Sequence, residues 1–220
     1  MSDVPEARPT RYSMAFFDVQ NLFRHAKDAF QQTAGDGYHH PNFDPLKLHA
    51  KVAEQLGVRP TLTRFYTGVP PVSESEMWGG YWNNRVLALK RARVLVETRK
   101  LRYHQEMLPD GTVYKVAHEK GIDIRISLDL VSCTRRKEFD VAIVFSQDQD
   151  LGEAVTEVKD IAREQGREIE IVSAFPQSPL ASSSRGIDKT TWFKFDQAFY
   201  DACIDPHDYR PARFQPVPPT

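Results

Sequence analysis

Residues 140–150 read DVAIVFSQDQD. The stretch 140–146 lacks the alternation of polar and apolar side chains that is typical of a half-exposed strand, so it predicts a strand buried on both faces. Such strands are found in parallel sheets that carry helices on both sides. Two carboxylates, Asp148 and Asp150, follow directly after this strand, where a buried element meets the surface.

Further strands and helices alternate around this stretch. We predict strands at 13–18, 61–69 and 168–174, and helices at 19–32, 44–57, 75–93, 123–138 and 151–166. The helix at 44–57 has a clear start in Asp44 and Pro45 and a clear stop in Gly57. A strand at 93–104, a Pro-Asp-Gly turn and a return strand predict a β-hairpin, interpreted as an insertion or an antiparallel edge. The alternation indicates an α/β fold with a mainly parallel central sheet.

Composition restricts the class of protein. The chain has 220 residues, of which 40% are hydrophobic, and a net charge of -1, so it can form a core but has no overall positive field that would attract a polyanion. Two cysteines at unpaired spacing and an N-terminus without an apolar segment favour a cytoplasmic protein that does not enter a membrane. We expect a flexible arm at 1–11, one domain at 12–203 and a proline-rich tail at 204–220.

Carboxylates end three of the predicted strands. Asp18 ends the strand at 13–18, Asp148 and Asp150 follow the strand at 140–146, and the return strand of the hairpin leads to Asp123. In an open parallel sheet, ligands bind at the carboxyl ends of the strands, so these acids are expected to share one cleft. The amide of Asn21, three residues after Asp18, is placed to orient Asp18 or a metal-bound water.

Carboxylates that lie close together repel each other and lose solvent, and a hard divalent cation relieves both costs. Oxygen ligands of this kind favour Mg²⁺ or Mn²⁺. A metal in such a site acidifies a bound water and offsets charge on a phosphoryl oxygen, which indicates hydrolysis of a phosphodiester.

Three stretches, FFDVQNL (16–22), EKGIDIRISLDLV (119–131) and DVAIVFSQDQDLGEAV (140–155), resemble the NYN domain, a PIN-like nuclease family that includes LabA-like proteins. The resemblance covers roughly residues 13–175. It implies a PIN-like three-layer α/β/α sandwich and a Mg²⁺- or Mn²⁺-dependent endoribonuclease acting on RNA with single-stranded or loop regions, and it is compatible with a homodimer. Carried over by position, the catalytic residues would be Asp18, Asn21, Asp123, Asp148 and Asp150, with the metal on Asp18, Asp123 and Asp148 and support from Asp129 and Lys120.

The chain departs from the family pattern at Gln147, where glycine is usual, and this puts the shape of that loop in question. Each acid also has a structural interpretation, because Asp18 and Asp123 suit helix N-caps and residues 148–150 suit a solvated turn. The order of the three motifs favours the shared site. Asp129 is weaker, since six positions after Asp123 is not the same helix face.

Two other groups of residues have open interpretations. The segment 90–102 carries six basic residues that suit either a phosphate-binding surface or a solvated helix end and edge strand. They are Lys90, Arg91, Arg93, Arg99, Lys100 and Arg102. The aromatic residues Trp78, Tyr81 and Trp82 could stack on unpaired bases, but packing in a core or a dimer is favoured.

Two other functions compete with the nuclease. One is a weakly active or inactive protein on the same fold that binds RNA or another protein, since fold alone does not fix activity. The other is a phosphatase of the haloacid dehalogenase type. That class needs a second aspartate two positions after the first, and here Gln20 stands two positions after Asp18.

Overall fold

The computed structural model describes residues 10–30, 42–108 and 110–215. At its centre lies a six-stranded sheet in which every neighbouring pair is parallel, in the order β3-β2-β1-β6-β7-β8. The strands are β1 (Tyr12–Asp18), β2 (Arg59–Val69), β3 (Leu95–Lys100), β6 (Val141–Phe145), β7 (Glu170–Pro176) and β8 (Thr191–Phe195). The central pair is therefore β1 and β6, the strands that precede Asp18 and Asp148.

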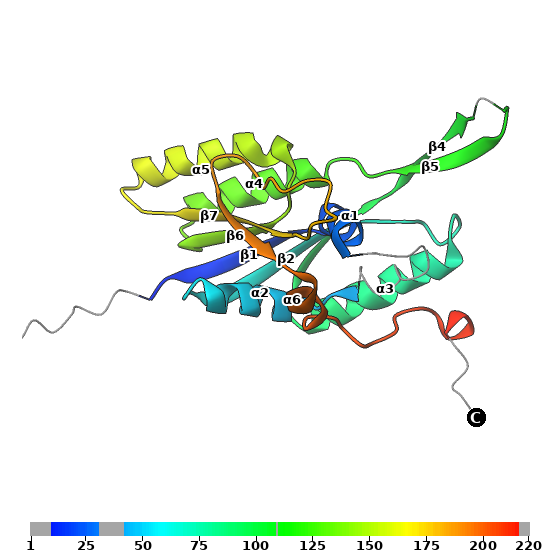
Figure 1. Cartoon of the computed structure of the whole chain (residues 1–220), viewed down its shortest axis with the longest axis horizontal. Coiled ribbons are helices and arrows are strands. Elements are labelled where there is room, and N and C mark those ends of the chain that lie inside the picture. The colour runs from blue at the N-terminus through cyan, green and yellow to red at the C-terminus, as the bar shows by residue number, and fades with distance from the viewer. Residues whose placement is uncertain (1–9, 31–41, 109, 216–220) are drawn as a thin grey trace, which may run out of the picture.

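Helices cover both faces of this sheet (Figure 1). One face carries α1 (Val19–Phe30), α2 (Pro45–Gln55), α3 (Glu76–Arg91) and α6 (Gln197–Asp201), and the other carries α4 (Ile122–Arg135) and α5 (Gly152–Glu164). Side chains alternate between two cores, so that Phe17 and Phe145 belong to the first and Phe16 and Val144 to the second. The predicted three-layer α/β/α sandwich with a mainly parallel sheet is confirmed.

Local signals at α2 are confirmed in detail. The Asp44 side chain accepts hydrogen bonds from the N–H groups of Leu46 at 2.9 Å and Lys47 at 3.1 Å. Pro45 occupies the first helical position, and Gly57 adopts a φ of +66° after the helix ends. Because these contacts join residues close in sequence, the sequence alone predicts them.

The predicted single strand at 93–104 is wrong. The chain instead forms β3, bends at Leu101, and continues as β4 (Arg102–Met107), which pairs antiparallel with β5 (Val113–His118). The N–H of Leu101 makes a last bond to the Val69 carbonyl at 3.1 Å, after which the chain leaves the sheet. Figure 1 shows the β4–β5 hairpin extending away from the sandwich. As a result, Asp123 does not end a strand of the main sheet but lies in the first turn of α4.

The described part of the predicted tail packs against α3. Tyr209 is buried, its ring lies edge-on to Tyr81 at 6.0 Å, and its carbonyl accepts a hydrogen bond from Asn84 Nδ2 at 3.0 Å. Residues 1–9 and 216–220 of the predicted arm and tail lie outside the described residues, and the domain boundaries stay predictions. None of the described helices combines the length and the apolar character needed to cross a membrane.

The buried His49 of α2 contacts both β1 and β2. It lies toward the amino ends of these strands, away from the carboxyl ends that carry the acids. His49 Nε2 lies 3.0 Å from Ser13 Oγ, and Nδ1 lies 2.9 Å from Thr63 Oγ1. Burial lowers the pKa of His49 to about 4, because the charged ring would lose its hydration.

We predict that His49 makes the protein less stable in mild acid. In the unfolded chain His49 is protonated below its ordinary pKa of 6.5, whereas in the folded chain it stays neutral down to about pH 4. The contribution of His49 to the free energy of unfolding is therefore complete above pH 6.5 and is lost as the pH falls from 6.5 to about 4. The loss reaches about 3 kcal/mol. Urea denaturation at a series of pH values measures it, and His49→Gln should flatten the difference. An equal slope for both proteins would contradict the assignment.

Candidate functional site

Asp18 is a buried carboxylate at the carboxyl end of β1, with 6% of its surface exposed. One oxygen accepts the N–H of Asn21 at 3.2 Å, so Asp18 does cap α1. The other accepts a hydrogen bond from Ser146 Oγ at 3.1 Å, and the same Oγ accepts the N–H of Asp148 at 3.1 Å. Ser146 therefore links the Asp18 side chain on β1 to the Asp148 backbone after β6. Asp18 thus has a contact beyond its role as a helix cap.

Asn21 has a positioning role that differs from the one expected. Its Oδ1 accepts the backbone N–H of Gln147 at 3.0 Å, and its own N–H binds Asp18. The start of α1 is thereby tied to the turn after β6. The D-x-x-N spacing thus supports the carboxylate and the neighbouring loop together.

Glu119 is a site residue that the sequence reasoning missed. It is half-buried between β5 and α4, and its Oε2 accepts the N–H of Gly68 at 2.6 Å. A Cβ at Gly68 would lie 2.5 Å from that oxygen and 2.4 Å from Leu101 Cδ2, so a larger residue would have to displace the ends of both side chains. The hydrogen bond places Glu119 beside the end of β2, next to Asp18. The signal available in the sequence is one acid directly before the K-G-x-D motif.

Four carboxylates at this edge influence each other electrostatically. The pKa of Asp18 is raised to about 6, mainly by burial and with a smaller contribution from the charge of Asp148, against the hydrogen bonds from Asn21 and Ser146 that lower it. Burial raises the pKa of Glu119 to about 7, with further contributions from the charges of Asp18 and Asp123 and an opposing one from the Gly68 N–H. Among the described residues, no lysine, arginine or histidine forms an ion pair with any of these four acids. We call Asp18, Glu119, Asp123 and Asp148 the acidic cluster.

Two basic side chains on α1 face the acidic cluster and were also missed. Arg24 is exposed, and its charge lowers the pKa of both Asp18 and Glu119. Burial lowers the pKa of the neighbouring His25, and the charge of Asp148 opposes that effect. Both residues follow Asn21 by three or four positions, so the period of a helix places them on one face with it.

Two of the predicted acids, the supporting Asp129 and the catalytic Asp150, lie outside the acidic cluster. Asp129 lies on the buried face of α4 and pairs with Arg64 at 2.8 Å and Arg125 at 2.9 Å, while Tyr66 donates to it at 2.9 Å. Its charge is therefore balanced by structural partners. Asp150 is exposed and contributes its backbone N–H, which binds Asp148 Oδ1 at 3.0 Å.

The predicted basic surface is divided between the two ends of β3. Lys90, Arg91 and Arg93 precede the strand, and Arg99, Lys100 and Arg102 lie at its carboxyl end, on the side of the acidic cluster. All six are exposed, as is Lys120. Six residues of strand separate the groups by about 20 Å. The group at the carboxyl end is the one placed near the acids.

Gln147 occupies the glycine position of the motif without backbone strain. Arg93, Lys137 and Lys189 are the residues other than glycine that adopt a positive φ in the described part of the chain. The side chain of Gln147 is buried and donates from Nε2 to the Arg185 carbonyl at 2.8 Å. The substitution therefore anchors a neighbouring loop and leaves the carboxylates in place.

The fold is an α/β sandwich of the PIN-like class, with the acidic cluster at the carboxyl ends of its central strands. The family model of the NYN domain matches residues 13–191, and the chain belongs to this family of nuclease-like, RNA-related proteins. A search of the curated proteins gives no match.

Among solved structures, the crystal structure of MurG from Acinetobacter baumannii aligns over 84% of this chain and 45% of that chain, at 11% identity and a TM-score of 0.30. This chain thus spans less than half of that protein's length, and a likeness of this size carries no argument.

The donor set of the acidic cluster suits a hard cation. All four groups are carboxylates, and two of them have pKa values raised by burial, a cost that a bound cation would offset. Within the described residues, no three acidic, histidine or cysteine side chains converge closely enough to enclose a metal ion. The cluster therefore fits a cation held directly by one or two carboxylates and otherwise by water, which is the usual mode of Mg²⁺.

Asparagine substitutions at two buried aspartates should affect the free energy of unfolding differently. Asp129→Asn leaves Arg64 and Arg125 without their counter-charge, and we predict a loss of about 3 kcal/mol in the free energy of unfolding. Asp18→Asn removes a charge that is buried beside another carboxylate, so stability should be kept or increased. Urea denaturation at pH 7.5 compares the two variants, and a larger loss for Asp18→Asn would contradict this division.

Gln147→Gly should destabilise the protein although glycine is usual at this position. The variant loses the bond to Arg185 and gains backbone freedom in the unfolded state, together about 1–2 kcal/mol. Thermal unfolding measures the effect, and Gln147→Ala separates the side chain from the backbone. A glycine variant more stable than the parent would show that the loop here prefers a left-handed residue.

Proposed function

We propose that this chain is a metal-dependent endoribonuclease that hydrolyses RNA phosphodiester bonds at the acidic cluster. The observation that carries the proposal is the position of Asp18, a buried carboxylate beside Asp148 and Glu119 that no ion pair neutralises among the described residues. Unpaired buried charge is costly and is retained at functional sites. Membership of the NYN family supports the same chemistry.

Mg²⁺ or Mn²⁺ is the proposed cofactor. Asp18 and Asp148 would hold it directly, since Ser146 binds the Asp18 carboxylate and the Asp148 N–H and the Asp150 N–H binds the Asp148 carboxylate. Glu119 and Asp123 would act through water. When bound, the ion supplies an acidified water and charge neutralisation at the phosphoryl oxygen.

The remaining residues would position the substrate and the acids. Ser146 Oγ and the Asn21 N–H fix both oxygens of Asp18, and Gly68 fixes Glu119, so the carboxylates need little rearrangement. Arg24 is exposed beside the cluster and would bind a phosphate that flanks the scissile one. Lys100 and Arg102 extend this positive charge toward the hairpin.

A second candidate is a protein on the same fold that binds RNA or another protein without cutting. The observation in its favour is that no three metal-binding side chains converge among the described residues. This function predicts RNA or protein binding that persists in EDTA and leaves the RNA intact.

A cleavage assay distinguishes the two. A labelled, largely unpaired RNA is incubated with Mg²⁺, Mn²⁺ or EDTA, and we expect metal-dependent cutting that falls at least about 100-fold in Asp148→Asn and Glu119→Gln. Asp150→Asn is the matched control, because Asp150 is exposed two positions from Asp148, and it should cut within a few-fold of the parent. Intact RNA with every metal would favour the second function. Equal losses at positions 148 and 150 would contradict the proposed cluster.

A further inference from the structure

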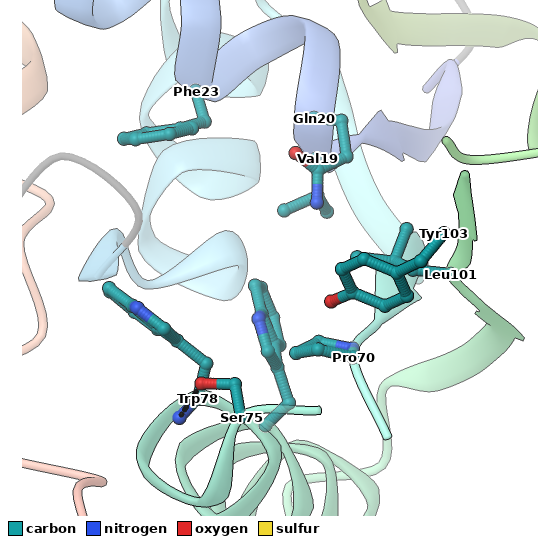
Figure 2. A pocket seen from close by; sticks show the side chains of 9 residues that line it. Val19, Gln20, Phe23, Pro70, Ser75, Trp78, Leu101 and Tyr103 are labelled. Atoms are coloured by element: carbon teal, nitrogen blue, oxygen red, sulfur yellow. Dashed lines mark hydrogen bonds between the residues drawn. The ribbon is translucent and has the colours of Figure 1, made fainter. Parts of the chain in front are cut away.

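An apolar hollow of about 240 Å³ lies next to the acidic cluster, between α1, α3 and the start of the hairpin. Four of its nine lining residues are aromatic. We call it the aromatic pocket, defined by Phe23, Pro70, Trp78, Trp82, Leu101 and Tyr103. Figure 2 shows the side chains of Phe23, Trp78 and Tyr103 arranged around a common space. The nuclease chemistry proposed above does not use this hollow.

The aromatic pocket shares its walls with the acidic cluster. Val19 and Gln20, which line it, directly follow Asp18, so their Cα atoms lie within about 8 Å of the Asp18 Cα. On the other side, Leu101 lies against Gly68, the residue that holds Glu119. A strand with a phosphate at the cluster would therefore place a neighbouring base at the pocket.

The three clustered aromatic residues of α3 take different roles. Tyr81 and Trp82 are buried in the core, as favoured from the sequence, although Trp82 also contributes to the pocket wall. Trp78 is half-buried, lies edge-on to Tyr81 at 5.4 Å and lines the pocket. Its ring is thus held in one orientation by the core while part of its surface faces the hollow, which is the arrangement that base stacking requires.

Charge and polarity around the pocket suit a nucleotide. Gln20 and Ser75 contribute polar groups to the lining, able to bond the edge of a base. Lys100 and Arg102, both exposed, flank Leu101 in the sequence and could bind the adjoining phosphates. An apolar peptide would make no use of these cations.

We propose that the aromatic pocket binds one unpaired nucleobase of the RNA, next to the phosphate that is cut. This inference rests on the proposed function and adds a preference, because a base that is paired in a duplex cannot enter the pocket and single strands are selected. Recognition by stacking tolerates every base, so little sequence preference is expected from this contact.

Binding measured without metal tests the pocket separately from cleavage. A fluorescein-labelled ten-residue single-stranded RNA is titrated in EDTA, beside the same RNA as a duplex, and anisotropy gives the Kd. Trp78→Leu and Tyr103→Leu should each weaken single-strand binding about 5- to 100-fold, and Trp78→Phe should restore most of it because a stacking ring is kept. Matched controls are Trp192→Leu, a part-exposed tryptophan on β8, and Tyr114→Leu on the second strand of the hairpin. These should bind like the parent.

The outcomes separate this inference from the nuclease. Unchanged Kd values for both pocket variants, no binding by the parent in EDTA, or equal binding of duplex and single strand would each overturn the pocket. Metal-dependent cleavage together with unchanged Kd values would leave the nuclease standing and remove the pocket. Pocket-dependent binding with no cleavage under any metal would keep the pocket and favour the second function.

Discussion

The hydroxyl of Ser146 donates to the buried carboxylate of Asp18, and the N–H of Gln147 donates to the side chain of Asn21. These two hydrogen bonds join the carboxyl ends of β1 and β6, the central strands of the sheet, and the rest of the candidate site is built around them. Directly behind them Phe17 and Phe145 stack at 4.0 Å, so the strand ends cannot separate without opening the core. The carboxylates are therefore held in place by the same packing that closes the sandwich.

The two buried aspartates, Asp18 and Asp129, differ in how their negative charge is balanced. Asp129, on the face covered by α4, is surrounded by Arg64, Arg125 and the Tyr66 hydroxyl, and its burial is balanced. Asp18 is about equally buried, but within the described residues its side chain accepts two hydrogen bonds and forms no ion pair, and further carboxylates lie nearby. Stability alone would favour a paired or neutral side chain at position 18, as it does elsewhere in the core. The cost at one position and its absence at the other support the proposal that the acidic cluster binds a cation.

The sequence predicted what depends on short-range signals. The buried run 141–145, the Asp44 cap and the strand ending on Asp18 each follow from neighbouring residues. The break between β3 and β4 does not, because it depends on the pairing of β3 with the distant strand β2. Glu119 was not predicted as a site residue for the same reason, because its position is set by a hydrogen bond from the N–H of Gly68, 51 positions earlier. The motifs in the sequence thus predict where the candidate site lies. Contacts between residues far apart in the sequence decide which side chains belong to it.

The replacement of glycine by Gln147 bears on how a substrate would reach the acidic cluster. Gln147 and Gln149 donate to the carbonyls of Arg185 and Gly186, so the loop before β8 is fastened over the end of β6. This loop is also fixed to α1, through Ser182 and Asp28 at 2.7 Å. On its β7 side the acidic cluster is bordered by this loop, whose backbone is held by hydrogen bonds. On its β2 side it adjoins the hairpin and the aromatic pocket. A side chain that departs from the family pattern therefore favours an approach from β2, where the proposed RNA strand would meet the cations and the stacking rings together.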